Sequence, residues 1–282
     1  EFYQLDLEMS FVEQEDVFQV VERLMVNVFK KFSSKKILQE KFPRIPYEES
    51  MLKYGTDKPD LRNPLLIYDI TNIFIRDDVK FDIFKKLVKS GSKVRCIVTK
   101  NTKDKPRSFF DNIDKWAKEQ GASGLAYFTI EKDKKLLAKG PVGKFFSESA
   151  LIEIMKITAA TEGDSVFLAC GKDQDVEKIS SLAREKIGRE LNLIDESKFA
   201  FCWIVDYPMF EFDDTTKKIN FSHNPFSMPQ GDIKKINLNK PLDIKAYQYD
   251  IVCNGIELSS GAVRNHIPEL MYKLFLIAGY SK

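Results

Sequence analysis

Apolar residues recur at different spacings along the chain, and each spacing predicts a type of element. From Tyr3 to Phe11 every second residue is apolar, which predicts a half-buried strand. Ser10 and Glu13 have the spacing of a capping box, so we expect an amphipathic helix to follow. The apolar stripe of that helix is expected to comprise Val17, Val20, Val21, Leu24, Val28 and Phe32.

A second stretch begins after the turn-rich segment 54–64 and alternates short apolar runs with lysine-rich amphipathic ones. The predicted strands are 93–100, 124–130 and 164–171. The predicted helices are 108–121, 147–160 and 175–191. Such a block can fold as an α+β unit of its own, although a lysine-rich surface is most often only a solvated face.

The last stretch returns to longer strands and ends in a helix near Ile267, with Pro268 in its first turn. The predicted strands are 199–207, 217–226, 246–254 and 255–266. This order indicates one antiparallel sheet flanked by helices and interrupted by an inserted block. We therefore predict the α+β class. The inserted block is expected to comprise residues 63–196, and the interrupted domain residues 1–62 and 197–282.

Composition narrows the possible functions. Hydrophobic residues make up 43% of the chain, and its 22 Phe can fill a core. The 44 basic and 42 acidic residues are too evenly balanced to argue for nucleic-acid binding by themselves. No apolar run is long enough for a membrane span. The four cysteines lack a C-x-x-C spacing, which predicts reduced thiols in a cytoplasmic protein, and two histidines are too few for a histidine-rich metal site.

The dipeptide Asn254-Gly255 predicts a tight two-residue hairpin turn. In that register residue 252 pairs with Glu257, and Asp250 pairs with residue 259, so the two acids share one face of the sheet. Paired carboxylates repel unless a cation lies between them, and Mg²⁺ accepts one or two carboxylates together with substrate phosphates. Two exposed surface acids are an equally open interpretation at this point.

Arg264 lies an odd number of residues from Glu257, so a regular strand would point their side chains to opposite faces. A bulge within Ser259-Ser260-Gly261 would bring Arg264 onto the same face, and these small residues would let a flat ligand approach the backbone. The guanidinium can then bind a carboxylate or phosphate, or form only a weak surface ion pair. His223 can position a polar ligand or serve only a structural purpose.

Five segments together carry a resemblance to a known family. They are EFYQLDLEMSF, YGTDKPDLRNP, WIVDYPMFE, HNPF and YDIVCNGIELSSGAVRNH. In their order and spacing the chain resembles bacterial-type aspartyl-tRNA synthetase, a class II aminoacyl-tRNA synthetase, over nearly its whole length. The resemblance implies a cytoplasmic aspartate–tRNA ligase. Such an enzyme uses ATP and Mg²⁺ to activate L-aspartate as aspartyl-adenylate, and the aspartyl group then passes to tRNA.

The resemblance also implies roles for residues around the amino acid. Arg264 matches the arginine that holds the side-chain carboxylate of aspartate. His223 matches a histidine that contacts aspartate and the adenylate. Gln4 and Asp6 match the polar strand face that lines the amino-acid pocket, and Glu8 is expected to support it.

Glu257 and Asp250 match the acids that bind ATP through Mg²⁺, and the middle block matches the insertion domain of the bacterial-type enzyme. The resemblance further implies a homodimer. The sequence departs from the family pattern at Asn224, where a second histidine is usual, and in the Leu-Ser-Ser-Gly stretch after Glu257. The arginine that clamps the α-phosphate, the final Gly-Leu-Asp-Arg stretch, the first dimer motif and the anticodon-binding domain are not found in these 282 residues. We therefore expect the 282 residues alone to be inactive.

Two alternatives share some of these features. A tRNA-dependent amidotransferase component can carry a similar insertion domain without ligase chemistry, but it does not need HNPF or NGIELSSGAVR. An asparaginyl-tRNA synthetase shares the sheet but lacks this insertion. The aspartate ligase is favoured because the chain has both motifs as well as the middle block.

Overall fold

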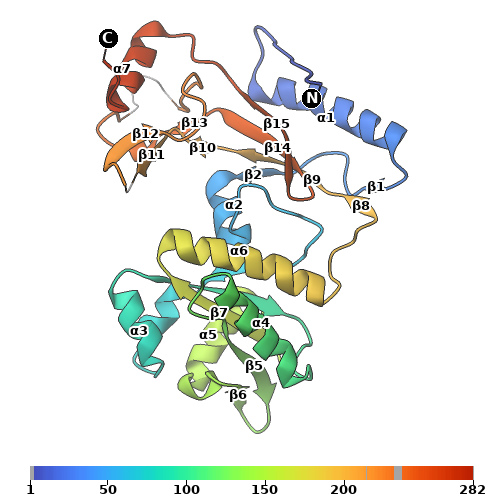
Figure 1. Ribbon diagram of the computed structural model, residues 1–282, viewed down its shortest axis with the longest axis vertical. Helices are drawn as coiled ribbons and strands as arrows, with labels where there is room; N and C mark the ends of the chain where they lie inside the picture. Colours follow the sequence, from blue (N-terminus) through green and yellow to red (C-terminus); the bar gives the residue numbers. More distant parts are fainter. Residues whose placement is uncertain (1–2, 214, 232–236, 282) are drawn as a thin grey trace. The chain divides into compact units, whose positions relative to one another are not determined.

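The computed structural model describes residues 3–213, 215–231 and 237–281 (Figure 1). The chain divides into two compact units. One, the outer unit, comprises Glu1–Glu48 and Glu196–Lys282, and the other, the middle unit, comprises Glu49–Asp195. The middle unit therefore begins upstream of residue 63, where the sequence pattern placed a boundary.

The main sheet of the outer unit has the order β15-β14-β9-β2. Its first three strands are antiparallel, as predicted, and β2 runs parallel to β9. The fourth predicted strand, 217–226, is shorter and pairs in a separate hairpin, β11 with β12. The elements of this unit are α1 (Gln14–Phe32), β1 (Lys36–Ile37), β2 (Arg44–Pro46), β8 (Lys198–Phe199), β9 (Phe201–Val205), β10 (Tyr207–Pro208), β11 (Phe210–Asp213), β12 (Lys218–Phe221), η4 (Pro241–Asp243), β13 (Lys245–Ala246), β14 (Gln248–Cys253), β15 (Ile256–Ala262) and α7 (Pro268–Ile277). The helix α2 (Tyr47–Tyr54) spans the boundary between the units.

The helix α1 packs on one face of this sheet through large aromatic side chains (Figure 1). Phe18 is fully buried, stacks on Trp203 at a centroid distance of 4.0 Å and meets Tyr249 edge-on at 4.8 Å. At the rim of this core, the Trp203 indole donates a hydrogen bond to Glu22 over 2.9 Å. The buried residues of this core are Phe18, Val26, Phe42, Phe201, Trp203, Val205, Tyr249, Ile251 and Cys253.

The predicted apolar stripe of α1 is largely wrong. The exposed members of that stripe are Val20, Leu24, Val28 and Phe32. The helix carries a second apolar stripe through Phe18 and Val26, and this stripe is the one that faces the sheet. An amphipathic pattern cannot choose between two apolar stripes, because the choice depends on which side chains fit the opposing surface.

The helix also starts later than predicted. Phe11 has a φ of 57°, a left-handed conformation that interrupts a helix begun at Ser10. The helix α1 instead begins at Gln14, where the Glu13 N–H donates to Asp16 Oδ2 over 2.8 Å. The capping box is therefore formed three residues further along the chain.

The predicted first strand is wrong for the described residues 3–11, none of which lies in a strand. Tyr3 is exposed at 103% and Leu5 at 75%, so the alternating apolar side chains have no core to enter. Alternation distinguishes two faces of an extended chain, but a strand also needs a neighbour that completes its backbone hydrogen bonds. Among the described strands, no neighbour does so for this segment.

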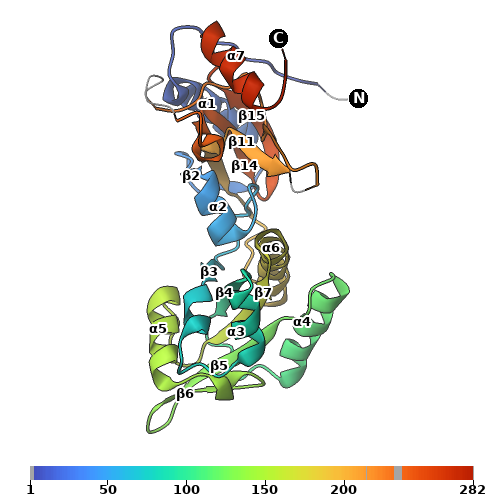
Figure 2. The same cartoon turned by 90° about the vertical axis from the view of Figure 1, so that its left-hand side faces the viewer.

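The middle unit is built around a five-stranded sheet of order β3-β4-β7-β5-β6, in which every neighbouring pair is antiparallel. All six predicted elements of this block are confirmed within a few residues. Figure 2 shows α5 on one side of this sheet and α4 and α6 on the other. The elements are β3 (Ile67–Asp69), η1 (Thr71–Ile75), α3 (Asp82–Lys89), β4 (Lys93–Thr99), α4 (Arg107–Glu119), β5 (Ala126–Lys132), β6 (Leu136–Lys139), η2 (Gly143–Phe145), α5 (Glu148–Thr158), β7 (Ser165–Gly171) and α6 (Asp173–Glu190).

Each face of this sheet has its own hydrophobic core. One core contains Ile154 of α5 and Phe128 of β5, and the other contains Phe110 of α4 and Ile187 of α6. Because both faces are covered, the strands are short, mostly apolar runs rather than strictly alternating ones. This explains why the short runs in the sequence were enough to identify them.

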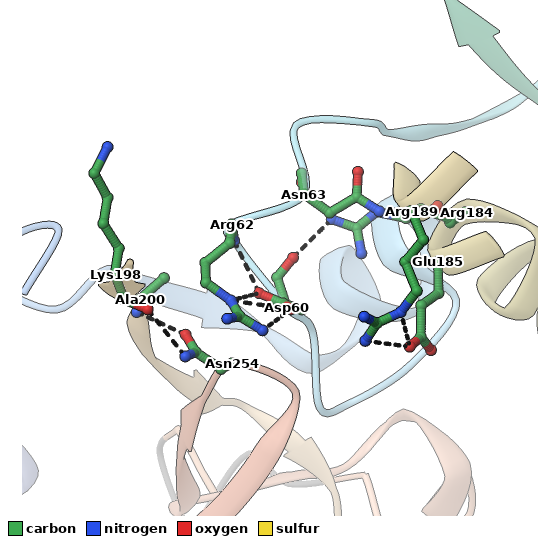
Figure 3. A network of polar contacts seen from close by, with 9 residues as sticks. All are labelled: Asp60, Arg62, Asn63, Arg184, Glu185, Arg189, Lys198, Ala200 and Asn254. Carbon is green, nitrogen blue, oxygen red and sulfur yellow. Dashed lines mark hydrogen bonds and ion pairs between the residues drawn. The ribbon is translucent and has the colours of Figure 1, made fainter. Parts of the chain in front are cut away.

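A buried arginine ties the turn-rich segment to α6 (Figure 3). Arg184 is 4% exposed and donates to the carbonyls of Leu65 (2.6 Å), Asp60 (2.9 Å) and Asn63 (2.7 Å). In return, the Asn63 side-chain amide donates to the Arg184 carbonyl over 2.8 Å. Burial lowers the pKa of Arg184 to about 10, which leaves it charged at neutral pH. The segment YGTDKPDLRN is therefore part of the middle unit's structure.

Candidate functional site

The hairpin between β14 and β15 turns at Asn254-Gly255, as predicted. Both residues have positive φ, 54° and 84°, which is typical of the type I′ turn. The Asn254 side chain also anchors the turn, since its amide donates to the Lys198 carbonyl over 3.1 Å and its oxygen accepts from the Ala200 N–H over 2.9 Å (Figure 3). The asparagine therefore serves both the turn and the attachment of the hairpin to the β8–β9 segment.

The register after the turn confirms one predicted pair and corrects another. Val252 pairs with Glu257, as predicted, but Asp250 pairs with Ser260 rather than with residue 259. The difference arises from a bulge at Leu258, slightly earlier than the predicted position within 259–261. Residues paired directly across two strands share a face, so Glu257 still lies on the Asp250 face of the sheet, one diagonal step away.

The glycine in this strand has a packing role that the sequence did not reveal. A Cβ on Gly261 would lie 2.4 Å from Cε2 of the Tyr249 ring, its pairing partner on β14. The ring therefore occupies the space above the glycine. Burial raises the pKa of Tyr249, the positive charge of Arg264 opposes this shift, and the negative charge of Glu8 adds to it.

The segment HNPF is held against β14 and against the Arg264 segment. Gln248 Oε1 accepts a hydrogen bond from the Asn224 N–H over 3.1 Å. Ser227, four residues after His223, is buried and forms a backbone bridge with Arg264. The Asn265 N–H donates to the Phe226 carbonyl over 2.7 Å. Two segments some forty residues apart in sequence are therefore side by side, and they carry the predicted aspartate-binding residues.

Asn224, where the family pattern has a second histidine, has a local structural role. Its side-chain oxygen accepts from the Phe226 N–H over 2.9 Å, which closes a turn around Pro225. The departure from the family pattern therefore helps to shape the segment that carries His223.

His223 and Asp250 are linked through a tyrosine. The Tyr207 hydroxyl donates to Asp250 Oδ2 over 2.6 Å, and the Tyr207 ring meets the His223 imidazole edge-on at a centroid distance of 4.6 Å. His223 is exposed, and its Nδ1 is hydrogen-bonded to Ser222 Oγ at 2.6 Å. Asp250 is buried at 3% exposure. The structure thus brings together two residues that the sequence predicted to act on different substrates.

Other predicted residues lie at the surface. Glu257 and Arg264 are exposed on β15 and just beyond its end. Gln4 and Asp6 are also exposed and are hydrogen-bonded to each other over 2.8 Å. Among the described residues, no hydrogen bond or ion pair joins Gln4 or Asp6 to His223, Asp250 or Arg264. The structure therefore groups the C-terminal candidates and leaves the two N-terminal ones apart from that hydrogen-bonded group.

The donor set of Glu257 and Asp250 fits Mg²⁺ bound together with phosphate oxygens. Within the described ranges, no cluster of three or more His, Cys, Asp or Glu side chains could hold a metal ion. Two carboxylate donors on one sheet face are what Mg²⁺ uses when waters and substrate phosphates complete its shell.

None of the helices in the described part of the chain has the length and apolar character that a membrane span requires.

Two residues that help to hold the candidate site together, Tyr207 and Gln248, were not predicted from the sequence. Tyr207 lies in WIVDYPMFE, one of the segments that carry the family resemblance, but no role was predicted for its side chain. Gln248 occupies the same face of β14 as Asp250, two positions before it, and the period of two in this strand would have identified it. Both residues stand in segments that the sequence singled out, but the sequence did not show that Tyr207 contacts Asp250 or that Gln248 contacts Asn224.

Comparisons with known proteins identify the family of this chain. The sequence model of the tRNA synthetases class II (D, K and N) matches residues 1–282. The Aspartate--tRNA(Asp/Asn) ligase of Pelagibacter ubique is 80% identical over 282 residues, which are 100% of this chain and 48% of that protein. The proteins of the same name from a Wolbachia pipientis of Culex pipiens and from Ehrlichia chaffeensis are 56% and 55% identical, and the chain covers 46% and 47% of their lengths.

The chain thus spans about half the length of the curated relatives that it matches. These relatives are named as ligases, so the comparisons do not support the amidotransferase alternative. Since the family model extends over all 282 residues, the chain belongs to the class II tRNA synthetase family (D, K and N).

Proposed function

We propose that this chain is the catalytic portion of an aspartate–tRNA ligase, which activates L-aspartate with ATP and transfers it to tRNA. One observation carries the proposal. The His223 segment, Asp250 and the Arg264 segment meet around β14 through Tyr207, Gln248 and Ser227. The names of the relatives, at up to 80% identity over the whole chain, support the same activity.

On the amino-acid side, we assign the side-chain carboxylate of aspartate to Arg264 and its polar contacts to His223. A guanidinium presents a planar pair of donors that matches a carboxylate, which favours aspartate over its amide. Gln4 and Asp6 are assigned to the same pocket, with Glu8 as their support.

On the nucleotide side, we assign ATP and Mg²⁺ to Glu257 and Asp250. When bound, Mg²⁺ neutralises phosphate charge and orients the phosphates for attack by the aspartate carboxylate. The two carboxylates differ in their surroundings, since Glu257 is exposed whereas Asp250 is buried and bonded to Tyr207. We therefore assign direct cation contact mainly to Glu257, with Asp250 as the more rigid partner.

The names of the relatives give their substrate as tRNA(Asp/Asn). We propose the same two tRNAs as substrates for the protein that contains this chain, with the cytoplasm as its location and a homodimer as its assembly. The middle unit is assigned as the insertion domain of the bacterial-type enzyme.

The proposal is tested in a hybrid enzyme, in which these 282 residues replace the matching stretch of the Pelagibacter ubique relative. We expect aspartate-dependent exchange of pyrophosphate into ATP, and charging of both tRNA(Asp) and tRNA(Asn). The unaltered Pelagibacter ubique protein, assayed in parallel, is the positive control. A folded hybrid without aspartate-dependent exchange would contradict the proposal. The 282 residues alone, assayed beside it, are expected to show no exchange.

A further inference from the structure

Tyr207 contacts both halves of the candidate site with different parts of one side chain. Its hydroxyl donates to the Asp250 carboxylate over 2.6 Å. Its ring meets the His223 imidazole at a centroid distance of 4.6 Å and an interplanar angle of 65°. The roles assigned above to Asp250 and His223 do not include this tyrosine.

Tyr207 is enclosed by the surrounding structure. Its side chain is 0% exposed, and its backbone is in β10, where it pairs with Ala246 of β13. The Tyr47 ring lies 5.0 Å from the Tyr207 ring and 6.4 Å from the imidazole, so three rings form one packed group. A buried phenol held in this way can fix the orientation of whatever it bonds.

The hydrogen bond to Asp250 is of the stronger kind, because its acceptor is a carboxylate. Side chains that hydrogen-bond a metal-binding carboxylate orient it, and replacing them typically lowers metal affinity or activity by about 10–100-fold. The contact with His223 is of a different nature. The tyrosine ring forms no hydrogen bond to the imidazole but restricts its position by packing against it. The two contacts can therefore be separated by substitution.

We propose that Tyr207 is a positioning residue for both substrates. It orients Asp250 for magnesium-bound ATP through its hydroxyl, and it places His223 for aspartate through its ring. This inference rests on the proposed function. Tyr207→Phe removes the hydroxyl and keeps the ring, whereas Tyr207→Leu removes both.

The test measures equilibrium binding of each substrate to the hybrid enzyme by calorimetry, first ATP with Mg²⁺ and then L-aspartate. For Tyr207→Phe we expect the affinity for magnesium–ATP to fall about tenfold, while aspartate affinity stays within about twofold. For Tyr207→Leu we expect both affinities to fall. In pyrophosphate exchange, Tyr207→Phe should likewise raise the KM for ATP but not the KM for aspartate, and Tyr207→Leu should raise both. Tyr127→Phe, which removes a hydroxyl from a buried tyrosine of the middle unit, is the matched control and should change neither.

Three results would overturn the proposal. One is unchanged magnesium–ATP binding in Tyr207→Phe, and another is an equal loss for both substrates in that variant, as a general loss of packing would produce. The third is unchanged aspartate binding in Tyr207→Leu. If the unsubstituted hybrid folds but binds neither substrate, the proposed function itself is wrong, and this inference with it.

Discussion

The two units use their polar side chains in opposite ways. In the middle unit, several buried polar groups complete their hydrogen bonds inside the unit. Asp164, with 0% side-chain exposure, accepts from Lys100 Nζ, from the Asn101 N–H and from the Thr161 N–H at 2.9, 2.9 and 2.7 Å. In the outer unit, His223 and Arg264 lie at the surface, on segments held by other residues.

The two kinds of polar side chain serve different purposes, one the stability of the fold and the other the binding of ligands. Burial raises the pKa of Asp164, but its hydrogen bonds outweigh this effect and keep the pKa below its usual value, which is typical of a carboxylate that stabilises a fold. A group that binds a ligand must instead be reachable and held in place by its neighbours. Substitutions in the middle unit should therefore affect mainly stability, and substitutions in the candidate site mainly activity.

The largest effect is expected from Arg264→Ala in the hybrid enzyme. Removing one partner of a bound charge pair costs about 3–5 kcal/mol, so kcat/KM for aspartate should fall by roughly 10²–10³-fold or more, with unfolding little changed. Arg264→Lys should also fail, because an ammonium cannot form the two-pronged contact. Arg107→Ala, at an exposed arginine of the middle unit, is the control. Normal aspartate activation by Arg264→Ala would remove this residue from the site.

The next largest effect concerns the middle unit. We expect residues 49–195, expressed alone, to unfold cooperatively, and Arg184→Met to destabilise them by about 3 kcal/mol, because three buried carbonyls lose their donor. Denaturant unfolding measures this difference. Arg189→Met is the matched control, since Arg189 lies on the same helix in an exposed pair with Glu185.

The same experiment tests where the middle unit begins. A piece starting at residue 63 lacks the Asp60 carbonyl that Arg184 contacts, and it also lacks Gly55, which lies close to Glu177 and Ser181 of α6. It should therefore be less stable than residues 49–195. Equal stability of the two pieces would place the boundary at residue 63, and a molten product from 49–195 would mean that the unit does not fold alone.

A smaller effect is expected from Gly261→Ala in the outer unit. The new Cβ would lie 2.4 Å from the Tyr249 ring, which is itself packed against Phe18, so the strand pair must shift. We expect a loss of about 2 kcal/mol in the unfolding free energy of the outer unit. Adding Tyr249→Leu should make the combined loss smaller than the sum of the two single losses. Additive losses would show that the ring and the glycine are not coupled.

The smallest effect is expected from Glu257→Gln, which should raise the Mg²⁺ concentration required for pyrophosphate exchange by roughly tenfold without altering the unfolding transition. A magnesium titration of the exchange rate measures this. Glu211→Gln, at another exposed acid of the outer unit, is the control. An unchanged requirement in Glu257→Gln would mean that Glu257 is a surface charge only.

Local signals in the sequence were sufficient for much of this fold. Asn254-Gly255 determined the hairpin because only a few residues tolerate two positive φ values in succession, and the pairing of Val252 with Glu257 follows directly from a two-residue turn. The helices and strands of the middle unit were equally readable, since each is a run of suitable length between turn-forming residues. Residue type and spacing also singled out Asp250, Glu257 and Arg264 as candidates, and their roles stay predictions.

Features that depend on contacts between residues distant in sequence were decided only by the tertiary structure. The bulge lies at Leu258 rather than later, and Tyr249 rather than a ligand occupies the space above Gly261. The face of α1 that is buried depends on the stacking of Phe18 on Trp203, because the helix has two apolar stripes. Tyr207 acquires its link to Asp250 from a strand more than forty residues away. Periodicity records which side of an element is apolar, but it contains no information about which surface that side will meet.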